Sequence, residues 1–523
     1  MMDSSLKIQI FCGVLALVFI FRKIWRGKSR KGTGMDLPEP SGALPIIGHL
    51  HKLGGGEPFF KVLGAMAEKN GPIFKLRFGM DTTLVISGWE VAKECFTTND
   101  KAFANRPASS AVKYMFYDDK MFPFTQYGPY WREMRKIVSN ELLSPRRLEM
   151  LRHFRINEIN MSIKSLYKKC VSTKPGEPFM ADMKIWFYDL MYNVVFTMVA
   201  GKRYFGSENA HDEMEARKYQ AILIEALRFA EISALGDAFP FLNYFGIGDY
   251  RKGMDRVAKV IDGFNSTLLK EHRQKRVSGD VECDRDFIDV LMSFLEETDI
   301  FPKHEHDTII KSTMLAMFLG GTDTSAVTLS WFLSLLLNNP DILQKARDEI
   351  DAHVGLERNV EEPDVNNLVY LQAIMKETLR LYPPAPLSIP HETMEDCVIA
   401  GYNVPAKARV IVNLWKMQKD PSVWSDPEEF KPERFLTTHA DVNFRGQHFE
   451  LLPFGSGRRS CPGISFTMQI MTLTLARLIH GFNMTTNSGL PVDLTPVSIG
   501  ATMPRQDPLE TVFTPRLEAH LYG

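Results

Sequence analysis

The chain has 523 residues, and its 62 lysines and arginines nearly balance 63 aspartates and glutamates. A near-neutral chain has no basic footprint for nucleic acid, so we expect no nucleic-acid partner. The six cysteines are far apart and do not form a pairing framework, which is typical of a reducing compartment. The middle of the chain has no flexible linker and no repeat, which favours one large domain.

Residues 1–31 are predicted to be a transmembrane signal anchor. Residues 6–25 are mostly apolar, and basic residues follow or overlap the end of this run. A cleaved signal peptide would carry its positive charge before the apolar run, and an interfacial helix is the other alternative. By the positive-inside rule, the rest of the chain is then cytosolic. We therefore expect a single-pass protein of the endoplasmic reticulum membrane, in contact with membrane lipid.

The segment after the anchor, residues 32–48, contains three prolines and is predicted to be a stiff hinge before the large domain of residues 49–523. Asn160, Asn265 and Asn483 each begin an Asn-X-Ser/Thr glycosylation sequence. In a cytosolic domain these asparagines should stay unmodified.

The large domain is predicted to be mainly helical with small β-sheets. Residues 73–78 and 82–87 are β-rich runs on either side of a turn, which indicates a hairpin. Strand-like runs return near 396–400, 408–413 and 510–520. Helical periodicity covers residues 89–98, 129–143, 144–171, 180–200, 211–231, 252–276, 285–295, 306–338, 340–354 and 365–381.

The predicted helix at 306–338 holds a long apolar run, residues 313–337, whose one charge is Asp323. Its length would fit a second membrane span, but small and polar residues crowd its middle, from Gly320 to Ser325. A charge inside an apolar helix is usually functional. We therefore favour a central helix of a large core, thinned by glycines, over a membrane span or a simple helix kink.

Three motifs place charged or aromatic residues at fixed spacing. Glu377 and Arg380 lie three apart and share a helix face, and Arg434 follows in a Pro-Glu-Arg-Phe sequence. Trp131 and Arg135 lie four apart on the helix that begins near residue 129. An ordinary amphipathic helix would also place an aromatic residue and an arginine four positions apart, as Trp131 and Arg135 are.

The loop from Phe454 to Gly463 has the spacing F-x-x-G-x-R-x-C-x-G around Cys461. Gly457 and Gly463 remove side-chain bulk, and backbone N–H groups can then point at the sulfur. Such a loop would present a thiolate to a haem iron, and the guanidinium of Arg459 would suit a haem propionate. A buried structural thiol is the alternative, while zinc would need further Cys or His ligands at finger spacing.

From about residue 36 to the end, the order and spacing of these motifs resemble the cytochrome P450 superfamily. Residues 48–51, 128–133 and 443–450 are similar to the plant family numbered eighty-two, CYP82, whose members act on specialised metabolites. The resemblance implies the P450 fold, with haem b between the long central helix and the cysteine loop. The sequence departs from the pattern at Lys407, where a glycine turn is expected, and at Lys419, where relatives usually have arginine.

The resemblance also implies roles for the motif residues. Cys461 would be the iron ligand, Thr324 would hydrogen-bond dioxygen, and Asp323 would relay protons to it. Residues expected to hold the haem propionates are Trp131, Arg135, His391 and Arg459. Residues expected to form a buried network for folding and haem retention are Glu377, Arg380 and Arg434. Residues expected by position to line an apolar substrate pocket, although core packing is the commoner fate of such side chains, are Phe116, Phe122, Phe124, Phe318, Leu319, Leu387, Ile389 and Met503.

The resemblance predicts a monooxygenase that hydroxylates or demethylates an alkaloid, coumarin, flavonoid or terpenoid. The chain has no glycine fingerprint for a flavin or nicotinamide, so NADPH electrons would come through a separate flavoprotein, NADPH–cytochrome P450 reductase. Arg132, Lys136 and Arg458 are candidates for its docking face. The alternatives are a reductase-independent haem-thiolate isomerase or dehydratase and a non-catalytic haem carrier.

Overall fold

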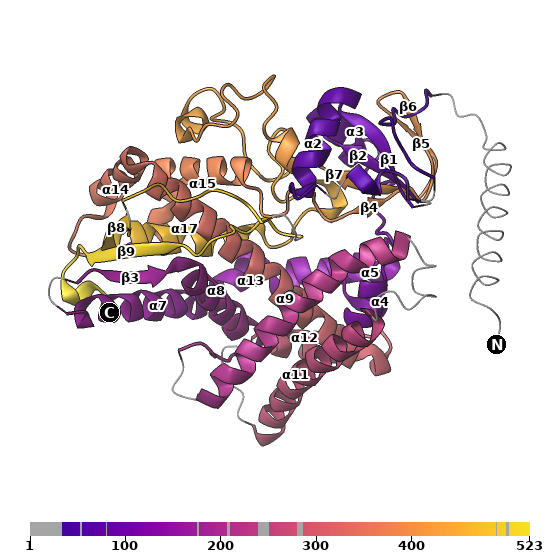
Figure 1. Ribbon diagram of the computed structural model, residues 1–523. Helices are drawn as coiled ribbons and strands as arrows, with labels where there is room; N and C mark the ends of the chain where they lie inside the picture. The colour runs from indigo at the N-terminus through magenta and orange to yellow at the C-terminus, as the bar shows by residue number, and fades with distance from the viewer. Residues whose placement is uncertain are drawn as a thin grey trace, which may run out of the picture.

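The computed structural model describes residues 34–45, 47–52, 55–79, 81–174, 177–206, 210–238, 250–279, 286–487, 489–497 and 501–522. Helices make up most of it, and small sheets lie at two of its ends (Figure 1). The predicted anchor at 1–31 lies outside the described residues. Among the helices that are described, none is both long and apolar enough to cross a membrane.

The first sheet contains the predicted hairpin. Strands β1 (Ile73–Phe78) and β2 (Asp81–Ile86) pair antiparallel, and β7 (Arg409–Val412) adds to β2 in parallel. Strand β4 (His391–Glu392) closes the order β1-β2-β7-β4. Helices α2 (Phe59–Asn70) and α3 (Trp89–Phe96) lie beside this sheet (Figure 1). The sheet thus holds His391 on a short strand at its edge.

The predicted hinge packs against this sheet where it is described. The carbonyl of Pro38 accepts a hydrogen bond from the Lys75 backbone N–H at 2.8 Å. Glu39 forms ion pairs with Lys75 and Arg77 of β1. The chain therefore enters the folded domain along β1.

The second sheet has the order β3-β9-β8, from β3 (Phe179–Asp182), β9 (Glu510–Pro515) and β8 (Phe482–Thr486). The prediction of helix at 180–182 is wrong, because these residues pair with β9 and Asp182 then caps the next helix through its side chain. The predicted strand at 510–520 ends at Pro515. A small hairpin joins β5 (Cys397–Ile399) to β6 (Tyr402–Val404).

The turn before β7 forms without the expected glycine. Lys407 takes that position with φ +62°, a left-handed conformation that side chains rarely adopt. Its N–H donates to the carbonyl of Thr393, and the Ala408 N–H donates to the Thr393 hydroxyl. Lys419, the other departure, is buried and pairs with Glu428 at 2.6 Å.

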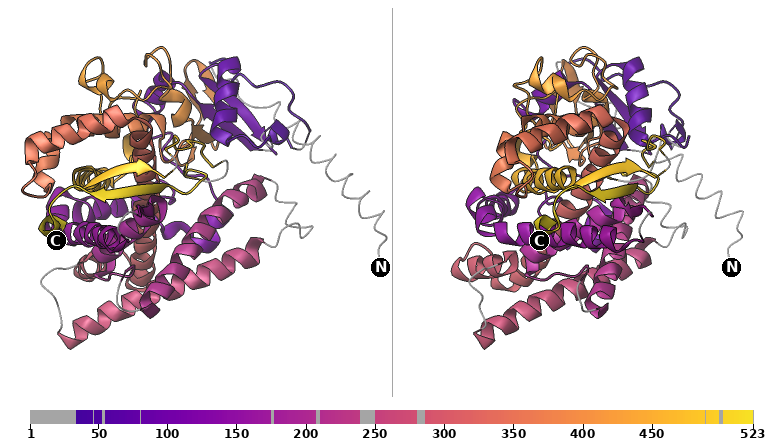
Figure 2. Two further views of the ribbon diagram at one scale, coloured as in Figure 1. Left: turned by 60° about the vertical axis from the view of Figure 1, so that its left-hand side comes forward. Right: turned by 90° about the vertical axis from the view of Figure 1, so that its left-hand side faces the viewer.

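Most predicted helices are present, and α13 (His306–Asn338) and α14 (Pro340–Val354) have the predicted bounds. Helix α13 runs through the middle of the molecule, whereas α9 (Ala210–Ala238) and α11 (Tyr250–Ser278) lie side by side at its edge (Figures 1 and 2). The remaining helices are α4 (Ser110–Met115), α5 (Pro129–Ile137), α6 (Pro145–Met150), α7 (Arg152–Ser172), α8 (Met183–Ala200), α12 (Phe287–Glu297), α15 (Val369–Leu381), α16 (Leu414–Met417) and α17 (Ile464–Gly481). Among the short helical turns, a π-helical one follows α5 (Val138–Leu142), and two of the 3-10 turns carry motif residues (Pro432–Leu436 and Gly457–Arg459).

Of two central helices, α13 was predicted from the sequence and α17 was not. Helix α13 packs against α8, α11, α12, α14, α15 and α17, so its apolar length is covered by protein. Helix α17 was not predicted, because from Ile470 to Gly481 every side is buried and no polar face marks the helical period. The cysteine loop leads directly into α17, which places that loop against the core.

Candidate active site

A cavity of about 290 Å³ lies between α13, the cysteine loop and the segment that precedes β4. It is lined by Cys461, by Thr324 of α13 and by a group of basic and aromatic side chains. Its other walls are mostly apolar and come from α5, α8, α12 and α17. Residues predicted to bind haem or dioxygen that line it are Trp131, Arg135, Thr324, His391, Arg459 and Cys461. The fold therefore gathers residues that lie more than 300 positions apart in the sequence.

The cysteine loop is shaped by backbone hydrogen bonds around Cys461. The Cys461 N–H donates to the carbonyl of Phe454 at 2.9 Å, and the Gly463 N–H points at the sulfur at 3.4 Å. Gly457 has φ +66°, and a Cβ there would lie 2.3 Å from the Asp100 carboxylate. Any side chain at position 457 would collide with Asp100, so this position requires glycine. Gly463 has a different role, because its N–H is the predicted donor to the sulfur.

Burial raises the pKa of the Cys461 thiol, and the Gly463 N–H and the charge of Arg135 partly oppose this effect. A metal cation at the sulfur removes such a proton outright, because a coordinating thiol is deprotonated. The surroundings of Cys461 therefore suit a metal-bound thiolate better than a free one.

Three guanidinium groups converge on the cavity: those of Arg106, Arg135 and Arg459. Arg459 lies over the Trp131 ring at 4.4 Å and donates to the carbonyls of Ala104 and Thr125. Arg135 donates to the carbonyl of Ser460 at 2.7 Å. Arg135 and Arg459 are thus held in place by backbone carbonyl oxygens. These oxygens carry no formal charge, so they do not neutralise the guanidinium charges.

Arg106 was not singled out from the sequence. It donates to the carbonyls of Pro123, Ile389 and Pro390, which ties three separate segments together. Burial, and to a smaller extent the neighbouring Arg459, lowers its pKa to about 9. The sequence has no spacing that connects these segments, so it held no signal for this residue.

This basic group fits the two carboxylates of a haem. Burial and the charge of Arg135 lower the pKa of Arg459 to about 9, and burial lowers the pKa of Arg135. No carboxylate of the described residues forms an ion pair with Arg106, Arg135 or Arg459. Cations that are buried or half-buried without counter-ions are costly, so the residues at this edge suit a bound dianion.

His391 lies in the same group and is buried. Its Nδ1 is 2.7 Å from the carbonyl of Phe103, which makes Nδ1 the donor. Burial and the charges of Arg106 and Arg459 lower its pKa well below the ordinary value. A carboxylate placed at this edge would favour the protonated imidazolium, whose second N–H could then donate to it.

Helix α13 brings two predicted residues to different places. Thr324 lines the cavity beside Gly320 and Gly321, and its hydroxyl donates to the Gly320 carbonyl at 2.8 Å. The Asp323 carboxylate is instead held by the hydroxyls of Tyr188 and Thr502. The neighbours in sequence therefore face different surroundings.

Glu377, Arg380 and Arg434 form a buried ionic network outside the cavity. Arg380 binds Glu377 through two bonds of 2.7 and 2.9 Å, and Arg434 Nε donates to the same carboxylate at 3.1 Å. The Lys431 backbone N–H adds a further donor at 2.9 Å. Both guanidiniums also bind backbone carbonyls of residues 418–429. The network fastens α15 to the segment that leads toward the cysteine loop.

The predicted substrate residues divide into two groups. Phe122 and Ile389 line the cavity. The other six are described but do not line it: Phe116 stacks on Phe124 with ring centres 5.6 Å apart, Phe318 packs on Phe196, and Leu319, Leu387 and Met503 are packed against other parts of the core. Apolar lining residues that the sequence did not indicate include Leu143, Val195, Met198, Val199, Phe287, Ala316, Met317 and Met471.

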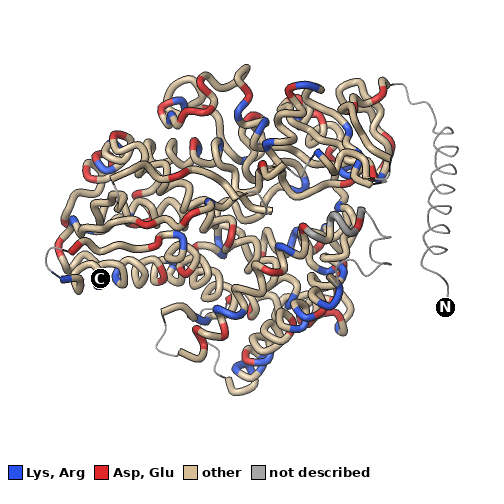
Figure 3. The backbone as a smooth tube through the Cα atoms, viewed as in Figure 1, with Lys and Arg blue, Asp and Glu red and all other residues tan. Residues whose placement is uncertain are grey.

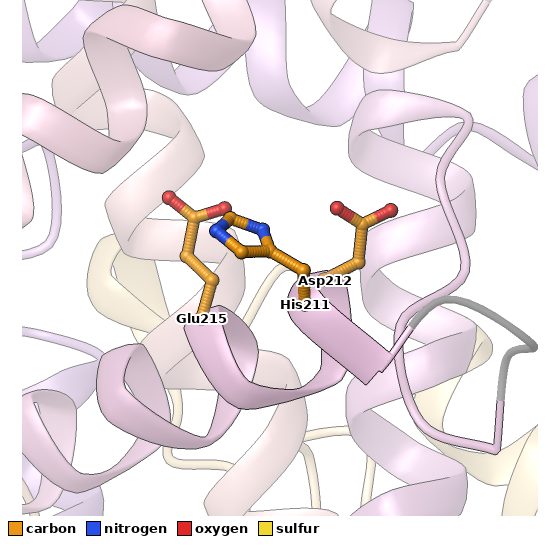
Figure 4. A group of neighbouring side chains, drawn as sticks. All are labelled: His211, Asp212 and Glu215. Atoms are coloured by element: carbon orange, nitrogen blue, oxygen red, sulfur yellow. The ribbon is translucent and has the colours of Figure 1, made fainter.

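A second group of possible metal ligands lies elsewhere. His211, Asp212 and Glu215 lie close together at the start of α9 (Figure 4). His211 is exposed, and Asp212 is near Lys202 at 3.8 Å. Basic and acidic residues are interspersed along the backbone throughout the molecule (Figure 3). His211, Asp212 and Glu215 lie outside the cavity and are not part of the candidate site.

Comparisons with known proteins agree with this geometry. The family model for cytochrome P450 matches residues 38–507. A xanthotoxin 5-hydroxylase of Arabidopsis thaliana, CYP82C4, is 48% identical over the whole of both chains. A strychnine-10-hydroxylase of Strychnos nux-vomica is 46% identical, and a protopine 6-monooxygenase of Eschscholzia californica is 45% identical, again over both whole chains.

Solved structures show the same fold. A zebrafish cytochrome P450 with progesterone superimposes with a TM-score of 0.72 at 24% identity, covering 88% of this chain and all of that one. At this identity the likeness concerns the fold alone. Together with the family match and the whole-chain relatives, it leads to one conclusion: this chain belongs to the cytochrome P450 family, among the plant CYP82 proteins, and is a P450 monooxygenase.

Proposed function

We propose that this monooxygenase is a haem-thiolate enzyme that inserts one atom of dioxygen into a C–H bond of an apolar plant specialised metabolite. The observation that carries the proposal is the cavity itself, where Cys461 and Thr324 lie with a basic edge that has no carboxylate partner in the described chain. The alternatives of an isomerase or a haem carrier do not need a hydroxyl at Thr324 on the cavity wall.

Haem b would be held by Cys461 at the iron, with Trp131, Arg135, His391 and Arg459 at the propionates. When bound, it supplies the reactive iron, and a thiolate ligand favours cleavage of the O–O bond. Arg106 belongs to the same basic edge and offers a further positive charge. The chain's own residues bind and orient the group, and the apolar walls keep bulk water from the reacting C–H bond.

The substrate class follows from the cavity walls and from the relatives. The walls are mostly aliphatic, aromatic and methionine side chains, which suits a medium-sized apolar molecule. The relatives are named for the oxidation of xanthotoxin, strychnine and protopine. We therefore propose an alkaloid or coumarin as the first substrates to test, ahead of flavonoids and terpenoids, with hydroxylation ahead of demethylation.

Electrons would come from NADPH through a separate membrane-bound reductase. Arg132 and Lys136 are exposed on α5, and Arg458 is exposed on the cysteine loop. Lys136 pairs with Glu133 and Arg458 pairs with Asp100, so docking would compete with these bonds. We place the enzyme at the endoplasmic reticulum, with residues 1–31 as its single span and the folded domain in the cytosol. In that domain Asn265 is fully buried and could not accept a glycan.

The deciding experiment is turnover by the purified full-length protein with NADPH, with and without a plant P450 reductase. We expect product from an alkaloid or coumarin panel to require both, and Thr324→Ala to consume NADPH with little product. An isomerase would form product without reductase, and a carrier would bind haem without turnover. Either result would overturn the proposal.

A further inference from the structure

The Asp323 carboxylate is anchored on the side of α13 that faces α8. The Tyr188 hydroxyl of α8 donates to Oδ1 at 2.6 Å, and the Thr502 hydroxyl donates to Oδ2 at 2.7 Å. The Thr502 segment is itself fastened to the core, since Trp331 Nε1 donates to the carbonyl of Met503 at 2.6 Å. Both carboxylate oxygens are therefore tied to donors on fixed elements.

Thr324, the neighbour of Asp323, has a separate partner in the Gly320 carbonyl. Asp323 is also absent from the residues that line the active-site cavity, although Thr324 is present there. A proton that leaves Asp323 for the cavity therefore requires the carboxylate to break one of its two anchoring bonds. The two anchoring bonds therefore oppose rotation of the carboxylate.

Tyr188 connects this carboxylate to a second, much smaller cavity. Lining residues of that cavity are Lys184, Tyr188, Val327, Ser330, Pro504, Arg505 and Asp507. Asp507, one of these lining residues, is exposed to solvent. A tyrosine hydroxyl can accept one hydrogen bond while it donates another. Tyr188 thus lies between this small cavity and Asp323.

We propose that Tyr188 is a positioning residue for proton delivery, passing protons from the small cavity to Asp323, while Thr502 anchors the other carboxylate oxygen. In each transfer the Tyr188 hydroxyl gives its proton to Asp323 and takes one from water or from the Lys184 ammonium. Tyr188 ends unchanged and Asp323 gains one proton. This inference rests on the proposed function, because dioxygen chemistry is what consumes the protons.

The electrostatics of Tyr188 are compatible with this role. Burial and the Asp323 carboxylate raise its pKa far above the usual value. The phenol therefore stays protonated at neutral pH and remains a donor. Removing the hydroxyl leaves the ring packing in place, so Tyr188→Phe interrupts the route without creating a large void.

The test compares Tyr188→Phe with the matched control Tyr370→Phe. Tyr370 also donates to a carboxylate, that of Glu433 at 2.8 Å, but it lies on α15 away from both cavities. With reductase and NADPH, we expect Tyr188→Phe to form roughly tenfold less product per NADPH consumed, with a larger solvent isotope effect. Tyr370→Phe should match the wild type in both measurements, and Thr502→Val, which leaves the route intact, should lose less than Tyr188→Phe.

A second readout needs no turnover. The infrared carboxylate band of Asp323 in the resting protein, assigned with Asp323→Asn, should shift in Tyr188→Phe and not in Tyr370→Phe. If Tyr188→Phe takes up less haem than the wild type, Lys184→Met offers a second variant, since it removes a proton donor at the small cavity without touching α13. Lys184→Met should raise the solvent isotope effect in the same direction.

The outcomes separate this inference from the proposed function. An active wild type together with a fully coupled Tyr188→Phe overturns the proton route alone, as does an unshifted infrared band. A wild type that forms no product with NADPH and reductase overturns the proposed function, and the route with it.

Discussion

Replacing Glu377 with alanine removes the one acid of a buried ionic network. Glu377 and Arg380 are fully buried and Arg434 is nearly so, and the carboxylate accepts four hydrogen bonds from Arg380, Arg434 and the Lys431 N–H. In Glu377→Ala, two guanidinium groups remain in the core without a counter-ion. Breaking a buried pair in this way costs about 3–5 kcal/mol.

A loss of about 4 kcal/mol reduces the folding equilibrium constant by roughly a thousandfold. Since domains of ordinary stability have about 5–15 kcal/mol in total, much of the Glu377→Ala protein should fail to fold and to keep haem. The assay is the midpoint of urea unfolding, together with haem bound per chain. We expect the midpoint to fall strongly and haem uptake to be lost.

Glu433→Ala is the matched control, because Glu433 belongs to the same Pro-Glu-Arg-Phe sequence but pairs with Lys345 where both side chains are about half exposed. Exposed pairs contribute about 0–1 kcal/mol, so this variant should keep its haem. The reasoning is refuted if Glu377→Ala and Glu433→Ala have the same unfolding midpoint, or if Glu377→Ala retains a normal haem content.

Three other variants probe backbone and charge. Gly457→Ala should lower the free energy of unfolding by roughly 1–3 kcal/mol and weaken haem retention, because its Cβ would meet Asp100 in a left-handed backbone. Lys407→Gly should raise stability by about 0.5 kcal/mol in thermal unfolding, since glycine relieves the φ of +62° at some entropic cost. Burial alone would lower the pKa of His272, but its bond to Asp286 and that charge raise it overall. His272 therefore stabilises the fold below about pH 6.5 and less as the pH rises through the raised value, so His272→Gln should cost more near pH 6 than near pH 8.5 in thermal unfolding.

Each of these variants has a comparison that could contradict it. Gly263→Ala, in α11 with open space around the site, should be neutral or stabilising, and an equal loss there would argue against the Asp100 contact. Lys407→Ala keeps the strained φ and should not gain stability, so a gain equal to that of Lys407→Gly would point to the lysine side chain instead. A pH-independent difference between wild type and His272→Gln would refute the raised pKa.

Local features were predictable because their physical causes lie within a few residues. The spacing around Cys461 creates its own turn and brings the Gly463 N–H to the sulfur. Glu377 and Arg380 face each other because they are one helical turn apart. Helix α13 ends where predicted, since its apolar run is followed by Asn338, Asn339 and Pro340.

Features made by long-range packing were not predictable from one sequence. Arg106 acquires its role because carbonyls near residues 123 and 390 close around it. The hydroxyls that hold the Asp323 carboxylate come from Tyr188 and Thr502, which no motif connects to it. Helix α17 was not predicted because it is buried on all sides from Ile470 to Gly481, so its sequence has no alternation of apolar and polar residues at the helical period.

The amino-acid sequence by itself determined the chemistry of this protein: a thiolate loop, a small-polar patch on a long helix, and a charged motif for the core. Each depends on neighbours along the chain. The tertiary structure alone decided which side chains line the cavity, which carbonyls hold its three arginines, and which hydroxyls hold the Asp323 carboxylate. These depend on contacts between segments far apart in the sequence, and such contacts follow from the packing of the whole domain.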